Sequence, residues 1–281
     1  MAKKGKCAAA AVLAALLVSL SVPAVCAHVA RTSSLPVFAD GETYPGEVRL
    51  EDGTAWVALR EFSLFASDGT ARIEWDPERR SALVSAAGLD MTAEEGERIL
   101  EANGRLLWCA GPAYIDGEVM FVTLRQISAA FGYECRYDGE RRAAILERSR
   151  GAILPGGEAR EAEDVYWLAK IIEAEAGAEP FLGKLAVGAV ILNRVDSDEF
   201  PGSVREVIFD TAGGVQFTPT ENGTIWGEAG EESVRAALVT LDNPRLWDGI
   251  AYFLNPPISR SLWIPAAREY AFTVGGHDFY R

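Results

Sequence analysis

The sequence predicts a two-domain α+β protein. Its 281 residues correspond to about two domains at a typical ~150 residues each. An internal repeat between Val57 and Leu146 predicts an α/β repeat module with antiparallel hairpins, and apolar residues at helical spacing after Asp164 predict that the second domain begins with helices. Hydrophobic residues make up 49% and charged residues 24% of the chain, a globular balance that excludes wholesale disorder.

The first 27 residues are predicted to be a secretory signal peptide. A basic start with three lysines is followed by an apolar stretch over residues 8–20 and by small residues before a cleavage site after Ala27. A membrane anchor is the alternative, but the apolar stretch is shorter than the ~20 residues that span a bilayer. We therefore expect a secreted protein.

The charge balance excludes several classes of function. The formal net charge is −14, whereas binding to nucleic acid or to anionic lipid needs basic patches. Only two histidines, His28 and His277, are present, which leaves little material for a metal site, and we predict neither a metal nor another cofactor. A serine triad is disfavoured because the chain has no G-x-S-x-G elbow.

Two cysteines, Cys109 and Cys135, remain after the leader is removed. In an oxidising compartment they can form one disulfide, and they can equally be two small buried hydrophobes. The export signal leads us to predict the disulfide.

Each copy of the repeat is predicted to fold as a strand, a short helix and a hairpin. Residues 57–62 match residues 122–127, and residues 75–84 match residues 137–146 after a short deletion. Asp76-Pro77 and Asp138-Gly139 supply the hairpin turns.

The acidic connection between the copies, Met91 to Asn103, is predicted to be a helix that ends at Gly104.

The repeat, over residues 35–149, resembles the domain family named after the N-terminal domain of copper amine oxidases. The shared elements are the "V-x-L-R-x-[hydrophobic]" motif and the aromatic-Asp hairpin followed by an apolar strand. The resemblance implies a structural or wall-binding module, and without histidine the segment offers no copper site. Its exposed arginine pairs are expected to be solvated hairpin residues, with a ligand site as the alternative.

Residues 150–163 are predicted to be a linker, because Pro155-Gly156-Gly157 marks a loop. The second domain then covers residues 164–281. All residues with a chemical role are expected there, so the first domain should be removable without loss of bond cleavage.

Glu175 lies on the apolar stripe of the first helix of the second domain. It follows Leu168, Ile171 and Ile172 at spacings of seven, four and three residues. A carboxyl beside apolar groups loses hydration, which raises its pKa and suits a general acid. The alternative, a side chain at the helix end that points to water, stays open on the pattern alone. Glu173 falls off the stripe and is predicted to be an ordinary surface acid.

The second helix is predicted over residues 181–194. Gly177 can end the preceding helix, and Pro180 suits the first turn of the next. The helix is apolar nearly all round, which predicts burial. Glu179 precedes its N-terminus, where the helix dipole favours an acid, so a capping role is one alternative for this residue.

Several separated blocks follow in order from Tyr166 to Tyr280. They are "AKIIEAEAGAEP", "GKLAVGAVILNRV", "FPGSV", "QFTP", "YFLNP" and "VGGHDFY". Together these blocks resemble the SleB-type cell-wall hydrolases, the spore cortex-lytic enzymes. The resemblance implies a mainly α lysozyme-like domain with a small β-sheet, in which the glutamate of the "AEA" triplet, Glu175, is the catalytic acid. Ala178 and Lys184 depart from the family pattern, which leaves the role of the side chain at 184 open.

A sugar groove is expected around Glu175, because aromatic faces pack on sugars while amides and hydroxyls hydrogen-bond them. His277 has a structural role as an equal alternative. The predicted substrate-binding residues are Glu179, Gln216, Phe217, Thr218, Tyr252, Asn255 and His277.

A second catalytic carboxylate has no strong argument in the sequence. The candidates are Glu173, Glu179, Asp196, Asp198 and Glu221. A single glutamate fits the family's lytic transglycosylase chemistry, in which the C6 hydroxyl of the sugar attacks C1, whereas most glycosidases use two carboxylates.

The resemblance therefore implies an enzyme that cleaves peptidoglycan glycan strands, and the predicted signal peptide makes it a secreted one. Its expected location is the cell wall, the spore cortex or the inner spore compartment. An accessory germination or cell-wall protein is a further candidate partner, and the oligomeric state is open. The alternative is a non-catalytic wall-binding protein. An amidase or peptidase ranks low because it needs a metal site or a Cys/His pair.

Overall fold

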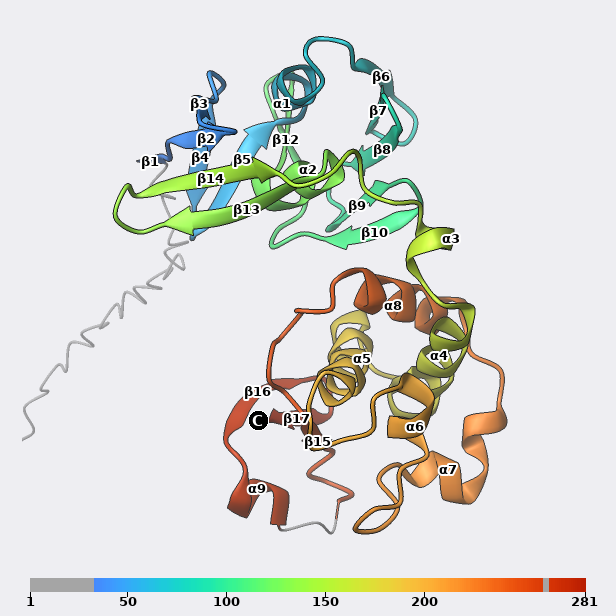
Figure 1. Ribbon diagram of the computed structural model, residues 1–281. Helices are drawn as coiled ribbons and strands as arrows, with labels where there is room; N and C mark the ends of the chain where they lie inside the picture. Colours follow the sequence, from blue (N-terminus) through green and yellow to red (C-terminus); the bar gives the residue numbers. More distant parts are fainter. Residues whose placement is uncertain (1–32, 260–262) are drawn as a thin grey trace, which may run out of the picture. The chain divides into compact units, whose positions relative to one another are not determined.

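The computed structural model describes residues 33–259 and 263–281 (Figure 1). The predicted signal peptide, residues 1–27, lies outside the described residues. No helix within the described ranges has the length and apolar character needed to cross a membrane.

The N-terminal region is rich in β-structure and forms three sheets, with strand orders β1-β4-β5-β12-β11, β10-β9-β8-β7-β6 and β13-β14-β2-β3. The strands are β1 (Ser33–Ser34), β2 (Val37–Ala39), β3 (Glu42–Thr43), β4 (Val48–Glu51), β5 (Thr54–Ala58), β6 (Arg72–Asp76), β7 (Ser81–Ala86), β8 (Leu89–Glu94), β9 (Ile99–Ala102), β10 (Arg105–Trp108), β11 (Tyr114–Asp116), β12 (Val119–Thr123), β13 (Tyr133–Asp138) and β14 (Ala143–Arg148).

The two copies of the repeat have the predicted order of strand, helix and hairpin. The first is β5, α1 (Leu59–Ala66), β6 and β7, and the second is β12, α2 (Leu124–Ala130), β13 and β14. The hairpin turns form as predicted, because the Asp76 and Asp138 carboxylates each accept two backbone N–H bonds from the residues that follow. Strands β5 and β12 lie side by side (Figure 1) and pair antiparallel with Val57 opposite its counterpart Val122. Ala58 then faces Phe121 and Trp56 faces Thr123, so the register is two-fold symmetric about the Val57–Val122 pair.

The prediction of a helix between Met91 and Asn103 is wrong. The segment forms β8 and β9, two paired antiparallel strands. Leu89, Met91 and Ala93 are buried in alternation, which is the period of a strand, while the intervening side chains face outward. Asn103 has a positive φ of 51° and begins the tight turn to β10.

The predicted disulfide is also wrong in this structure, where Cys109 and Cys135 are both free. Cys109 follows β10 and is buried in the core, whereas Cys135 lies on β13, in another sheet. Burial raises the pKa of the Cys109 thiol to about 11, so this side chain is neutral at physiological pH.

The C-terminal domain is mainly helical, as predicted, with a small antiparallel sheet of strand order β15-β17-β16. Its first two helices match the predicted ranges to within two residues. The elements are α4 (Ala162–Ala176), α5 (Phe181–Val195), α6 (Val204–Ile208), α7 (Thr218–Asn222), the 3-10 helix η1 (Thr224–Trp226), α8 (Glu231–Asp242), β15 (Tyr252–Leu254), α9 (Trp263–Ala267), β16 (Tyr270–Val274) and β17 (His277–Tyr280).

Helix α5 is buried along nearly its whole length, as its apolar sequence predicts. It contacts α4 and α8 closely at Gly188, where an added Cβ would lie 2.7 Å from Thr240 Oγ1 and 3.1 Å from Ile172 Cδ1. This packing fixes the end of α4, and with it Glu175, against the rest of the domain.

The predicted linker contains a short helix, α3 (Gly156–Ala159). It contacts the β9–β10 turn through Gly156 and helix α8 through Arg160. The Gly156 N–H donates to the Asn103 carbonyl at 2.9 Å. Arg160 and Arg105 both pair with the carboxylate of Asp242, whose side chain is fully buried. The linker is therefore held by hydrogen bonds and by a buried charge cluster.

Candidate active site

One cavity of about 790 Å³ in the C-terminal domain is lined by Glu175 and by every residue predicted to bind substrate. The lining comes from the end of α4, the α4–α5 connection, the end of α5, the segment before α7 with α7 itself, β15, α9 and the start of β17. The predicted substrate-binding residues on it are Glu179, Gln216, Phe217, Thr218, Tyr252, Asn255 and His277. Segments far apart in the sequence thus meet around one carboxyl group.

Glu175 lies in the last turn of α4 and faces the cavity. Burial raises the pKa of its carboxyl from 4.5 to about 7, as the apolar stripe predicted. No hydrogen bond or ion pair of this carboxyl is found among residues 33–259 and 263–281. The group is therefore able to hold a proton near neutral pH and to release it to a molecule in the cavity.

Glu173 is not the ordinary surface acid that the sequence predicted. Its carboxylate accepts hydrogen bonds from the Ser233 hydroxyl at 2.7 Å and from the Gly230 N–H at 3.1 Å. These bonds, the one from Ser233 first, lower the pKa of Glu173. The side chain anchors the start of α8 to α4 and does not line the cavity.

Glu179 ties the α4–α5 connection to the β16–β17 turn. Its Oε2 accepts the Gly276 N–H at 2.8 Å, and its Oε1 lies 3.5 Å from Nδ1 of His277. The turn needs glycine at position 275, where φ is +58° and an added Cβ would lie 1.9 Å from Glu179 Oε2.

Lys184, whose role the sequence left open, is buried and supports this connection. Its Nζ donates to the Glu179 carbonyl at 2.7 Å and pairs with Glu232 at 2.7 Å. Lys184 therefore holds the backbone that presents Glu179.

His277 and Asn255 line the cavity, and each has one buried polar atom without a hydrogen bond among the described residues. Nδ1 of His277 and Oδ1 of Asn255 are buried and have no hydrogen-bond partner in the part of the chain that the structure describes. Burial lowers the pKa of His277, so its ring is neutral near pH 7. Both residues line the cavity, and Nδ1 of His277 lies 3.5 Å from Oε1 of Glu179.

Arg194 is a residue of the cavity wall to which the sequence gave no role. Its Nε donates to the Ala251 carbonyl at 2.7 Å, and its Nη1 lies 3.5 Å from Oε1 of Gln216. Three aromatic rings surround the guanidinium, with centroids at 4.8, 5.1 and 5.4 Å, and they belong to Phe200, Phe217 and Tyr252. Burial lowers its pKa only to about 10, so the side chain stays cationic. The charged group therefore holds the Ala251 carbonyl and the Gln216 side chain of the cavity wall in place. The available signal was an arginine at the end of an otherwise apolar helix.

The other candidates for a second carboxylate lie elsewhere. Glu175 and Glu179 are the acids that line the cavity among the described residues, and Asp196, Asp198 and Glu221 do not line it. Within the same residues, no group of three His, Cys, Asp or Glu side chains is placed to hold a metal ion.

Comparison with known families gives two matches. The family described as Cell Wall Hydrolase matches residues 178–280, which contain most of the cavity lining. The chain contains a cell wall hydrolase domain. The copper amine oxidase N-terminal domain family matches residues 39–146, in front of that hydrolase domain. The hydrolase match begins three residues after Glu175, so the place of this side chain in the cavity comes from the structure.

Curated relatives of the hydrolase domain are named spore cortex-lytic enzymes. The protein from Halalkalibacterium halodurans is 36% identical over 116 residues, which are 41% of this chain and 34% of the relative. The Bacillus subtilis protein is 34% identical over 128 residues, 46% of this chain and 40% of the relative. A protein from Bacillus cereus is 33% identical over 135 residues, 47% of this chain and 49% of the relative. The chain thus spans half or less of the length of these relatives.

Among solved structures, the catalytic domain of a germination-specific lytic transglycosylase from Bacillus anthracis is 34% identical. It is covered completely by 46% of this chain, with a TM-score of 0.38.

Proposed function

We propose that this protein is a secreted lytic transglycosylase that cleaves the glycan strands of peptidoglycan in the spore cortex or cell wall. The observation that carries the proposal is the Glu175 carboxyl, which is half-buried, has a pKa of about 7 and faces a cavity lined by aromatic and hydrogen-bonding side chains. The names of the curated relatives support cortex peptidoglycan as the substrate class.

In the first step of the proposed reaction, protonated Glu175 gives its proton to the glycosidic oxygen as the bond from C1 to that oxygen breaks. Positive charge then develops on the sugar beside the new Glu175 carboxylate, and the attraction between the two favours the transition state. In the second step the C6 hydroxyl of the same sugar attacks C1 and gives its proton to Glu175. The products are a 1,6-anhydro end and a free hydroxyl, and Glu175 is again protonated.

Glu179 is the residue that a hydrolytic alternative would use. In that case water attacks C1, and a second carboxylate is needed as base or nucleophile. The Glu179 carboxylate already accepts the Gly276 N–H and lies beside His277, which favours a positioning role for it. We therefore place both proton transfers on Glu175.

A wall-binding protein without activity is the second candidate function. Burying a carboxyl without a cation or a hydrogen-bond donor lowers stability at neutral pH, and a purely binding domain gains nothing from that cost. The state of Glu175 therefore favours catalysis.

The pH profile tests the proposed role of Glu175. Because the acid must be protonated when substrate binds, kcat/KM for soluble glycan fragments is expected to fall above pH 7 and to approach a tenfold loss per pH unit. The measurement is the initial cleavage rate between pH 5 and 9, with circular dichroism to show that the chain stays folded. A rate that is constant or rises between pH 7 and 9 would contradict the role.

Secretion through the predicted signal peptide, residues 1–27, belongs to the same proposal. A substrate in the cortex or cell wall lies outside the cytoplasmic membrane, so the enzyme has to be exported. An accessory germination or cell-wall protein stays a candidate partner.

A further inference from the structure

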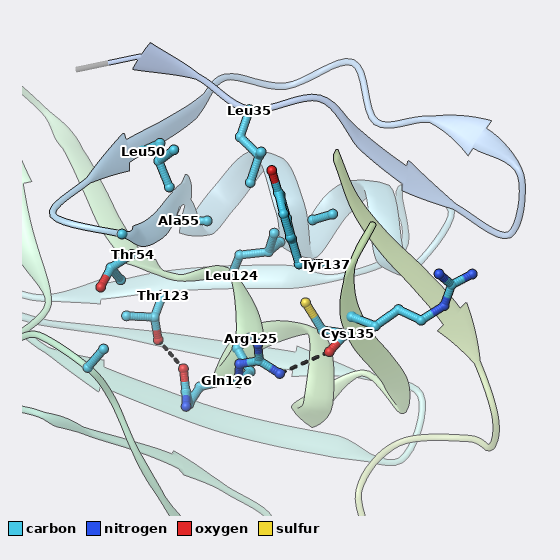
Figure 2. A pocket seen from close by; sticks show the side chains of 14 residues that line it. Leu35, Leu50, Thr54, Ala55, Thr123, Leu124, Arg125, Gln126, Cys135 and Tyr137 are labelled. Carbon is cyan, nitrogen blue, oxygen red and sulfur yellow. Dashed lines mark hydrogen bonds between the residues drawn. The ribbon is translucent and has the colours of Figure 1, made fainter. Parts of the chain in front are cut away.

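The N-terminal module has two pockets that correspond through the internal repeat. The larger, about 400 Å³, contains Tyr137 and is named here the Tyr137 pocket (Figure 2). The smaller, about 220 Å³, contains Trp75 and is named the Trp75 pocket. Each of the eleven residues that line the Trp75 pocket has its repeat counterpart in the lining of the Tyr137 pocket. The two pockets are therefore equivalent sites of one duplicated unit.

Both copies contribute to each pocket. The first turn of a short helix and the aromatic residue of the hairpin come from one copy, as Arg125 and Tyr137 do in the larger pocket. The opposite wall comes from the other copy, through Thr54 in the larger pocket and its counterpart Val119 in the smaller. Each copy supplies one wall of the other copy's pocket because β5 and β12 pair with two-fold symmetry.

A large aromatic side chain is exposed at the same position of both pockets. Trp75 is 45% exposed and Tyr137 is 61% exposed. Figure 2 shows the Tyr137 ring standing beside Leu35 and Leu124, so that part of it covers apolar side chains and part stays open. Exposed apolar surface adds little to folding stability, and its presence in both copies points to a ligand that covers it.

Polar side chains line each pocket together with the aromatic ring. In the Tyr137 pocket, Arg125 is fixed by a 2.9 Å hydrogen bond from Nη1 to the Cys135 carbonyl, and Gln126 accepts from the Thr123 hydroxyl at 2.5 Å (Figure 2). In the Trp75 pocket the corresponding residues are Arg60 and Glu61. A pocket that combines an aromatic face with hydrogen-bonding side chains suits a sugar ring, which has an apolar C–H face and polar hydroxyl edges.

We propose that the two pockets bind the glycan strand of peptidoglycan, with one sugar ring stacked on Trp75 and another on Tyr137. The identity of the glycan rests on the proposed function of the hydrolase domain. A polymer of repeating sugars can occupy two equivalent sites at once, so binding at one site raises the effective concentration of the strand at the other. The module thereby holds the enzyme on its insoluble substrate.

Binding to insoluble peptidoglycan sacculi tests the proposal. The full chain carrying Glu175→Gln is used, so that the sacculi are not digested, and the bound fraction is measured against the amount of sacculi. Trp75→Ala and Tyr137→Ala are each expected to weaken binding by ~3–10-fold, and the double variant more than either single one.

Leu83→Ala is the matched control, because Leu83 lies in the same module, is 40% exposed and lines neither pocket. It should bind like the parent chain. Equal binding by the parent and the double variant would overturn the proposal, and so would an equal loss in the Leu83 variant.

A second assay separates this proposal from the proposed function. With Glu175 intact, the Trp75→Ala/Tyr137→Ala chain should cleave soluble glycan fragments at the parent rate and sacculi more slowly. If the parent chain cleaves soluble fragments but the double variant digests sacculi equally fast, the two pockets do not hold the strand. If the parent chain cleaves no fragments at all, the proposed function fails, and the binding assay still decides the role of the pockets.

Discussion

Glu175→Gln is expected to lower kcat/KM for soluble glycan fragments by at least ~10²–10⁴-fold. Glutamine keeps the size of the side chain but cannot transfer a proton, and the proposed mechanism uses Glu175 in both steps. The measurement is the initial rate of fragment cleavage near pH 6.5, where the wild-type carboxyl is largely protonated. A variant that cleaves near the wild-type rate would contradict the assignment.

Stability measurements show whether the Glu175 variant is folded. The folded pKa of Glu175 is raised from 4.5 to about 7, so its contribution to stability is full below pH 4.5 and is lost as the pH rises through 7. Glutamine does not ionise. Glu175→Gln should therefore be more stable than the wild type above pH 8, on the order of 1–3 kcal/mol, and similar to it near pH 4.

Glu173→Gln is the matched control on the same helix. It should retain most of the activity because Glu173 does not line the cavity. It should lose some stability, because its carboxylate accepts the bonds from Ser233 and Gly230. A loss of activity as large as that of Glu175→Gln, with the fold intact, would show that the catalytic acid had been misassigned.

Asp242→Ala is expected to lower the free energy of unfolding by ~3–5 kcal/mol. The Asp242 side chain is fully buried and pairs with Arg105 and Arg160, the latter at 2.6 Å, and it accepts the Leu106 N–H at 2.6 Å. Its removal leaves two partly buried guanidinium groups and one amide without their partner. Urea denaturation of the full chain measures the effect.

Glu97→Ala provides the comparison for Asp242→Ala. Glu97 pairs with Arg235 at 3.9 Å, and both side chains are about half exposed, so its loss should cost under ~1 kcal/mol. Equal stability of the Asp242 and Glu97 variants would show that the buried charge cluster contributes nothing. The same cluster qualifies the sequence prediction that the first domain can be removed. A chain that starts near Arg160 loses Arg105 and Leu106, so it should cleave fragments but unfold more readily.

Local patterns predicted the elements of this chain well. The Asp76 and Asp138 turns depend on hydrogen bonds to residues two and three positions on, which a sequence shows directly. The prediction of a helix between Met91 and Asn103 rested on acidic composition. Leu89, Met91 and Ala93 instead alternate with the period of a strand, and this alternation matches the observed structure.

The site was predictable where one helix carried the information. The stripe on α4 placed Glu175 among apolar groups, and burial does raise its pKa. The stripe did not predict the hydrogen bonds of Glu173, because its partner Ser233 comes from a helix that the sequence cannot place beside α4. The role of Arg194 was missed for a related reason, since the rings that surround it come from separate segments.

The most direct test of the proposed mechanism is the chemistry of the new glycan ends. Sacculi or soluble fragments are digested by the wild-type chain in H₂¹⁸O, and the released muropeptides are analysed by mass spectrometry. Attack by the C6 hydroxyl predicts 1,6-anhydromuramic acid ends without ¹⁸O, in amounts that vanish with Glu175→Gln. Reducing muramic acid ends that carry ¹⁸O would contradict the single-glutamate mechanism and would make Glu179, the other acid that lines the cavity among the described residues, the candidate for activating water.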